Sequence, residues 1–339
     1  MMGNRFFNLL PILKIQEGYF IMPKQVSFPG FGIGPFTVDP DAISIGDFAI
    51  KWYAVFIVCG MITAALYVHF RSKKYGMLLD DLLDLCIYIV FPAVIGTRLY
   101  YVIFKKLEDP STYTTLWQVI NIRDGGLAIY GGIITGAIMT FTVLSVKKMR
   151  IAPFVDIIAP GLMIAQAICR WGNFMNVEAY GSETTLPWRM GIVEFGKWIY
   201  VHPTFLYESL WNVLGFVLLM FLYKRKKFDG QICLSYVAWY GLGRMFIEGL
   251  RTDSLYIGNT GIRVSQLIAA ICFVGAVTAL IWLSIRLKNK PLATCMYTPE
   301  SKNYKASLEA IAQYEKSCQE KTKAKEEKRK EKEAARKQK

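Results

Sequence analysis

The 339-residue sequence has few of the residues on which metal sites and disulfide frameworks depend. Histidine occurs only twice, as His69 and His202, so three imidazoles of this chain cannot share one metal ion. Cysteine occurs seven times, but most of the cysteines lie in apolar runs without paired spacing, which predicts small buried side chains and not a zinc site or a set of disulfides. The sequence therefore indicates no metal, and metalloprotease chemistry is not expected.

Long apolar runs are what the sequence has in quantity, since 53% of its residues are hydrophobic. Runs of roughly 20 residues match the length that an α-helix needs to cross about 30 Å of hydrocarbon. We therefore predict an all-α polytopic membrane protein with seven transmembrane helices. The expected spans are residues 49–70, 82–104, 126–146, 154–172, 203–223, 231–250 and 264–286.

Basic residues are unequally divided between the two sets of loops that these spans define. One set carries 13 lysines and arginines, against seven in the opposite set. Because cytoplasmic loops carry the excess of positive charge, we expect the N-terminus outside and the C-terminus in the cytoplasm. This topology places a small extracytoplasmic head, residues 173–202, between the fourth and fifth spans.

The two ends of the chain differ from the spans in composition. Residues 1–48 contain five prolines, which prevent a spanning helix, and we expect an extracytoplasmic segment whose residues 1–21 are an extension. Residues 49–290 form the expected catalytic domain. From Ser301 onward, 13 basic and 7 acidic residues give a net charge of +6. We therefore expect residues 291–339 to be a charged, solvated cytoplasmic tail near anionic lipid, disordered or in part helical.

Charged residues within the expected spans are costly and are candidate functional residues by default. At about 1.5 Å per residue, Arg98, Arg170, Arg244 and Glu248 all fall in the outer half of the bilayer. Two arginines at one depth favour a phosphate site, because guanidinium presents a fixed fork of donors. Tyr240, Arg244, Glu248 and Arg251 follow spacings of four, four and three, so they share one helical face, and Arg244 and Glu248 can pair. The alternative is that this ion pair only stabilises the bundle.

Two further patterns allow a structural explanation beside a functional one. The glycine-rich start of the third span, residues 125–136, suits either close helix packing or the approach of an acyl chain. The aspartates at positions 80, 81 and 84 are similar to the magnesium motif of prenyl transferases, but acidic residues are also favoured in the first turn of a helix. We favour the helix-start explanation for these aspartates.

Several of these motifs together resemble the bacterial prolipoprotein diacylglyceryl transferases, over roughly residues 22–290. The most specific segment is residues 161–181, GLMIAQAICRWGNFMNVEAYG. Further matching residues are Ser27-Phe28-Pro29, Gly34-Pro35, Trp52-Tyr53, Arg98, His202-Pro203-Thr204, Tyr207-Glu208, Tyr240-Gly241, Arg244 and Glu248.

The resemblance implies an enzyme of lipoprotein biosynthesis in the bacterial plasma membrane, with its active site toward the outer leaflet. Such a transferase moves the diacylglyceryl group of phosphatidylglycerol to the lipobox cysteine of a preprolipoprotein and releases glycerol phosphate. Its implied partners are this lipid, the lipobox peptide and the bilayer, with no cofactor and no nucleic acid. The residues implied to bind the lipid are Arg170, Arg244, Tyr53, Asn173 and Gly181. Those implied in catalysis are Arg170, Arg244, Glu178, Tyr130, Tyr240 and Glu248, supported by Arg98, Asn176 and Glu208.

One position departs from the family pattern. Many members carry a histidine in the glycine-rich span, proposed as the base for the thiol proton, where this chain has Tyr130. A phenol with a pKa near 10 is a poor base at pH 7. Either activity is lost or that histidine is not an obligatory base, and we favour the second.

Rival functions lack their own signatures in the sequence. A lipid or organic-anion transporter should show internal repeats or broken helices at the midplane, and neither is evident. An intramembrane protease would need an activated serine or an aspartate pair. Tyr53, Tyr130 and Glu208, in the first, third and fifth spans, are also expected in the outer half of the bilayer. A structural scaffold would not explain polar groups from six helices at one depth.

Overall fold

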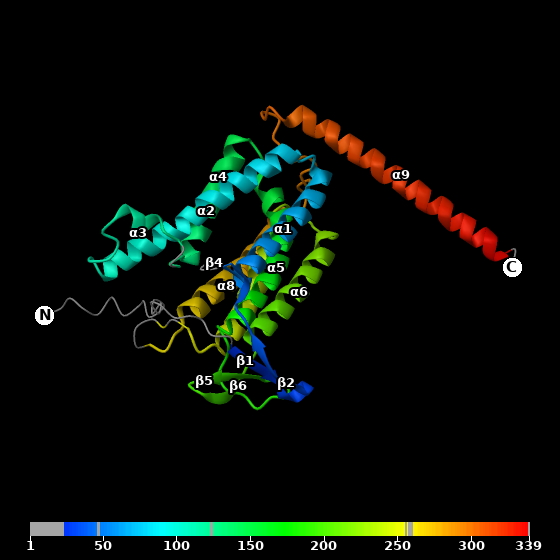
Figure 1. The fold of residues 1–339 in the computed structure, drawn as a ribbon. Helices are drawn as coiled ribbons and strands as arrows, with labels where there is room; N and C mark the ends of the chain where they lie inside the picture. The colour runs from blue at the N-terminus through cyan, green and yellow to red at the C-terminus, as the bar shows by residue number, and fades with distance from the viewer. Residues whose placement is uncertain (1–23, 46–47, 123–124, 255, 257–259, 338–339) are drawn as a thin grey trace. The chain divides into compact units, whose positions relative to one another are not determined.

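A computed structural model of the chain describes residues 24–45, 48–122, 125–254, 256 and 260–337 (Figure 1). The expected extension over residues 1–21 lies outside these residues. The chain divides into two compact units, one formed by residues 1–67 and 155–292 and the other by residues 68–154 and 293–339. We refer to them as unit 1 and unit 2.

Helices dominate both units, as the apolar runs predict. Among the described residues, six helices are long and apolar enough to cross a membrane. Unit 1 contains most of α1 (Trp52–Ser72) and α5 (Ile151–Asn176), with α6 (Thr204–Tyr223), α7 (Gln231–Glu248) and α8 (Val264–Arg286). Unit 2 contains α2 (Leu79–Glu108), α3 (Leu116–Ile120), α4 (Ile129–Val146), α9 (Tyr304–Lys337) and the 3-10 turn η3 (Lys73–Tyr75).

The helix α7 forms where the sixth of the seven expected spans lies, but it is not among the six most apolar helices. Its 18 residues include two charged side chains, Arg244 and Glu248, together with several polar ones. Arg244 and Glu248, which lower its hydropathy, are among the residues that we expected at a functional site. The structure therefore bears out a polytopic helical protein with six such spans.

A four-stranded antiparallel sheet, which the all-α expectation omitted, lies in unit 1 beyond the ends of α5 and α6 (Figure 1). Its strand order is β2-β1-β5-β6, and one face forms a small apolar core with Val177 and Phe205. Val177 follows α5 and Phe205 belongs to the first turn of α6, so the sheet fixes the C-terminal end of α5 and the N-terminal end of α6. The strands are β1 (Lys24–Phe28), β2 (Ile33–Val38), β5 (Met190–Glu194) and β6 (Lys197–Val201); β3 (Asp41–Ile45) and β4 (Phe48–Lys51) form a separate pair.

Unit 2 holds the beginning of the tail, which is not disordered as expected. Met296 and Tyr297 are fully buried, and the side chains of Tyr297 and Asn303 both donate hydrogen bonds to Asp81 of α2. The 34-residue helix α9 then follows, because a sequence rich in Ala, Glu and Lys favours helix. Charge alone was therefore a poor guide to order in this tail.

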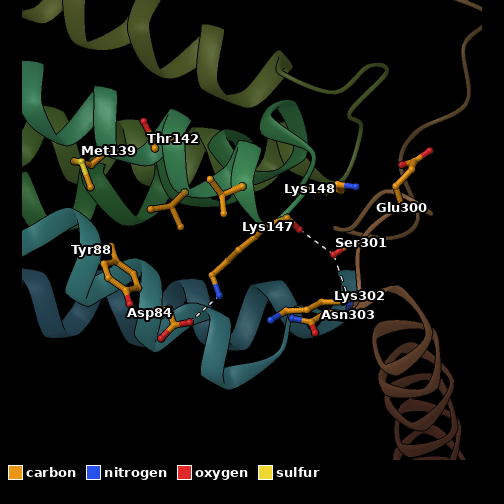
Figure 2. A pocket seen from close by; sticks show the side chains of 12 residues that line it. Asp84, Tyr88, Met139, Thr142, Lys147, Lys148, Glu300, Ser301, Lys302 and Asn303 are labelled. Carbon is orange, nitrogen blue, oxygen red and sulfur yellow. Dashed lines mark hydrogen bonds and ion pairs between the residues drawn. The ribbon is translucent and has the colours of Figure 1, made fainter.

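A cavity of about 710 Å³ lies in unit 2 between α2, α4 and this tail segment (Figure 2). Lys147 reaches into it and contacts Asp84 at 2.7 Å, while the Ser301 hydroxyl donates to the carbonyl of Lys147 at 2.9 Å. Asp81 also pairs with Lys147 at 2.5 Å. Asp81 and Asp84 thus join α2 to α4, and Asp81 also joins it to the tail. Asp80 and Asp81 lie in the first turn of α2, which agrees with the helix-start explanation that we favoured.

Candidate active site

The centre of the charged cluster in unit 1 is Glu208, in the second turn of α6. Its side chain is 4% exposed, so its carboxylate needs partners inside the protein. Three guanidinium groups surround it, from α5, from α7 and from the segment after α7. They are Arg170 at 2.6 Å, Arg244 at 3.0 Å and Arg251 at 3.5 Å.

A second buried carboxylate, Glu248, shares one of these arginines. Arg244 and Glu248 lie four residues apart on α7, and their side chains meet at 2.6 Å. The sequence predicted this pair correctly. Three guanidinium groups thus face two almost completely buried carboxylates, Glu208 and Glu248, and Arg251 also pairs with the half-exposed Asp253, so the cluster is balanced in formal charge. An anionic ligand would be bound by the guanidinium donors that remain free.

The two arginines within helices keep donors for such a ligand. A guanidinium has five N–H groups. Within the described part of the chain, Arg170 contacts Glu208 and the side-chain oxygen of Asn173, the latter at 3.4 Å, and Arg244 contacts Glu208 and Glu248. The carboxylates therefore fix both guanidinium groups in place without using all of their hydrogens.

A chain of polar contacts leads from Arg170 to the loop after α5. The Asn173 amide, which accepts from Arg170, donates in turn to Glu178 at 2.9 Å. Glu178 is exposed and lies between Val177 and Ala179, both with left-handed backbone, at φ of 48° and 55°. Such conformations cost of order 1–3 kcal/mol each and often mark functional loops. The phenol of Tyr53 interacts electrostatically with Glu178 and Arg170.

Gly181 lies where the head meets the segment after α7. Its N–H donates to the carbonyl of His202 at 2.9 Å, and it forms a β-bridge with Arg251. A Cβ atom at this position would lie 2.7 Å from the Cβ of His202 and 3.1 Å from the carbonyl oxygen of Leu250. Only glycine allows these backbones to approach so closely, and this approach holds Arg251 beside the cluster.

Arg251 is itself oriented by Asp253, which it contacts through Nε at 2.9 Å and Nη2 at 2.7 Å. Burial raises the pKa of Asp253, but the hydrogen bonds and positive charge of Arg251, with a backbone hydrogen bond and the charge of Arg244, together outweigh it, so the pKa lies below its usual value. Sequence reasoning placed Arg251 near the helical face of Arg244 but did not include it among the site residues. The regular spacing from Arg244 was the available signal, although α7 ends before Arg251.

The α6–α7 pair is fixed next to the cluster by two stacked tryptophans. The rings of Trp211 and Trp239 lie 4.3 Å apart, and each indole N–H donates to the other residue's carbonyl at 3.0 Å. Each ring also covers a glycine of the opposite helix, where a Cβ would come within 2.1 Å of Trp211 at Gly243 and 2.4 Å of Trp239 at Gly215. This arrangement sets the spacing between Glu208 on α6 and Arg244 on α7.

Arg98 and Tyr130 belong to unit 2. Arg98 is 7% exposed, and all five of its N–H groups donate to main-chain carbonyls of the connector between α2 and α4. These carbonyls belong to Gln118, Val119, Asn121, Gly125 and Gly126, at 2.7 to 2.9 Å. No donor of Arg98 is left for a phosphate, so its guanidinium folds the connector that leads to Tyr130 on α4.

The structure thus brings together most of the predicted site residues of unit 1. Tyr240 of α7 interacts electrostatically with Arg170, and Asn176 ends α5, where its carbonyl accepts a hydrogen bond from Lys24 at 3.3 Å. Within the described ranges, no group of three or more His, Cys, Asp or Glu side chains is arranged to hold a metal ion.

Comparisons with known proteins identify the family of the chain. The sequence model of the family described as prolipoprotein diacylglyceryl transferase matches residues 40–282. A phosphatidylglycerol–prolipoprotein diacylglyceryl transferase of Streptococcus uberis is 45% identical over 245 residues, covering 70% of this chain and 92% of the relative. A similar protein of Clostridium perfringens is 42% identical and covers 75% of this chain and 97% of its own length. One of Listeria welshimeri is 43% identical and covers 77% of this chain and 94% of its own length. The chain therefore belongs to the prolipoprotein diacylglyceryl transferase family.

Proposed function

We propose that this protein transfers the diacylglyceryl group of phosphatidylglycerol to the thiol of a lipobox cysteine in a preprolipoprotein. The observation that carries the proposal is the convergence of Arg170, Arg244 and Arg251 on Glu208. Arginines that are already held by carboxylates and still have free donors are suited to bind a phosphodiester. The names of the relatives supply the lipid and the protein substrate.

The proposed reaction is a displacement at a glycerol carbon. The cysteine sulfur forms a C–S bond, the C–O bond to phosphate breaks, and the bonding electrons leave with glycerol phosphate. Negative charge grows on the departing phosphate, where Arg170 and Arg244 stabilise it. The thiol proton goes to a carboxylate, because a thiol with a pKa near 8.5 is mostly protonated at pH 7.

Of the two candidate carboxylates, we favour Glu178 as the proton acceptor. Glu248 is 2% exposed and engaged by Arg244, which suits an orienting role. Glu178 is exposed and receives its hydrogen bond from the neutral amide of Asn173. In this proposal Tyr130 holds a phosphate oxygen or the incoming thiol, and Tyr53, Gly181, Tyr240 and Asn176 complete the site.

The proposed topology follows the charge of the loops. Seven spans including α7, an outside N-terminus and a cytoplasmic C-terminus put the cluster in the outer half of a bacterial plasma membrane. The sheet of unit 1 then forms the extracytoplasmic head. This orientation suits a substrate whose cysteine emerges on the outer face.

The test uses purified protein in liposomes with phosphatidylglycerol labelled in its acyl chains and a lipobox peptide. Label should reach the cysteine peptide but not its Cys→Ser counterpart, and Arg170→Ala should abolish the transfer. Lipid binding without any transfer by the unchanged protein would contradict the proposal and favour a lipid carrier.

A further inference from the structure

A buried amide without a matching donor lies one turn from Glu208. Asn212 of α6 is 2% exposed, and within the described part of the chain no hydrogen bond reaches its side-chain oxygen. Leaving such an acceptor unpaired costs about 1–3 kcal/mol, so buried amides normally have partners. The exception at Asn212 calls for a donor that comes from outside the chain.

A small cavity beside this amide can receive such a donor. Its volume is about 10 Å³, which is roughly the space of one water-sized group. It lies between α6 and α7, within unit 1, and adjoins the arginine cluster. The residues that line it are Glu208, Trp211, Asn212, Tyr240, Gly243, Arg244 and Ile247.

The lining groups restrict what can bind there. Glu208 and the oxygen of Asn212 only accept hydrogen bonds, Arg244 only donates, and the Tyr240 hydroxyl does both. A phosphate oxygen ionised at pH 7 only accepts, so it would leave Asn212 unpaired. A hydroxyl group donates and accepts through one small oxygen atom, and it satisfies both kinds of partner.

We infer that Asn212 accepts a hydrogen bond from a headgroup hydroxyl of the donor lipid while the neighbouring arginines bind its phosphate. This inference rests on the proposed function and adds the residue that selects the headgroup. A lipid without that hydroxyl leaves a buried acceptor unpaired, which is an effective way to reject an analogue. Asn212 therefore favours phosphatidylglycerol over anionic phospholipids with plain alkyl headgroups.

The experiment compares phosphatidylglycerol with phosphatidylpropanol, which has the same charge and headgroup length but no headgroup hydroxyl. We expect the unchanged protein to prefer phosphatidylglycerol in kcat/KM by about 5- to 150-fold, the range for one such hydrogen bond. Asn212→Leu removes the amide at similar volume and should bring this ratio close to one, through the loss of activity with phosphatidylglycerol.

Gln166→Leu is the matched control. Gln166 of α5 is another amide whose buried oxygen accepts no hydrogen bond within the described residues, but it does not line the cavity, and its Nε2 donates to the Tyr236 hydroxyl at 2.9 Å. The preference should survive this change. A general loss of packing would affect both variants alike and both lipids alike.

The outcomes separate the inference from the proposed function. Equal use of the two lipids by the unchanged protein would overturn the inference, and this result does not depend on the folding of any variant. A preference that persists in folded Asn212→Leu would overturn it as well, because the preference would then not depend on the amide. Water would then be the partner of Asn212 in the unchanged protein. Transfer from neither lipid by the unchanged protein would instead contradict the proposed function.

Discussion

Two buried arginine sites, one in each unit, use the same side chain in opposite ways. In unit 2, Arg98 donates all five of its N–H groups to carbonyls of one connector. In unit 1, Arg170 and Arg244 are held by the carboxylates of Glu208 and Glu248 and keep donors in reserve. Arg98 has no N–H group left for a ligand, so only the second arrangement can bind an anion.

The comparison shows that a buried arginine indicates a ligand site only when its donors have been counted. Carbonyl groups neutralise a guanidinium by hydrogen bonding and consume its hydrogens. Carboxylates supply full charge, so a few contacts suffice to hold the group. Replacing residues in each region should therefore affect different properties, catalysis in unit 1 and stability in unit 2.

The largest effect is expected for Arg170→Ala. Loss of a guanidinium that stabilises charge on the leaving phosphate should lower kcat by about 10²- to 10³-fold or more. Steady-state transfer from labelled phosphatidylglycerol measures this change. Activity within tenfold of the unchanged protein would remove the distinction between the two arginine sites.

Arg98→Lys should instead reduce stability. An ammonium has three donors for five carbonyls, so at least two hydrogen bonds to a charged group are lost, at a cost of about 3 kcal/mol. Denaturant unfolding in detergent would report the loss, and kcat per folded molecule should change little. A stable Arg98→Lys protein with a raised KM for the lipid would show that Arg98 binds substrate after all.

Glu208→Gln tests whether the shared carboxylate positions the arginines. The amide keeps the shape but not the charge, so three guanidinium groups lose their common counter-ion. We expect kcat to fall by about 30-fold while KM for the lipid stays the same or decreases, because net positive charge increases. An increase in KM with unchanged kcat would contradict a positioning role.

Tyr130→Phe removes one hydroxyl from unit 2. If this hydroxyl holds a phosphate oxygen or the thiol, kcat/KM should fall by about tenfold, the value of one hydrogen bond. Tyr130→His, which restores the residue of many relatives, should retain activity. Full activity of Tyr130→Phe would exclude Tyr130 from the site.

The smallest effect concerns the outer edge of the cluster. The pKa of Asp253 is lower in the folded protein than its value near 3.8 in the unfolded chain. Its ion pair with Arg251 therefore stabilises the fold fully above pH 3.8, and this stabilisation is lost as the pH falls through the pKa of the folded state. Asp253 is 50% exposed, so the contribution is small. The difference in Tm between the unchanged protein and Asp253→Asn should therefore be constant from pH 7 to about pH 5 and shrink as the pH falls below 3.8. A difference that does not shrink would exclude this ion pair as its cause.

Helix positions were predictable from the sequence because membrane thickness fixes their length. The expected span 264–286 coincides with α8, and the span 203–223 begins one residue before α6. The sheet was missed because its strands are short and come from segments more than 150 residues apart, with β1 pairing to β5. No local pattern predicts that pairing.

The site was predictable where spacing along one helix decides proximity, as for Arg244 and Glu248. The site was less predictable where residues meet through contacts between segments far apart in the sequence. Arg98 looked like a candidate ligand residue, since no sequence pattern reveals that five backbone carbonyls converge on it. The tail was misjudged for a related reason: Met296 and Tyr297 are buried through hydrogen bonds and packing with residues more than 140 positions earlier.

The reciprocal stack of Trp211 and Trp239 affects how the helices α6 and α7 respond to the thickness of the surrounding bilayer. Bilayers differ in thickness, and helices commonly adjust by tilting or sliding past their neighbours. Two indoles hydrogen-bonded to opposite helices prevent sliding, so α6 and α7 must tilt together as one body. The distance between Glu208 and Arg244 should therefore stay the same in bilayers of different thickness, and with it the arrangement of the cluster.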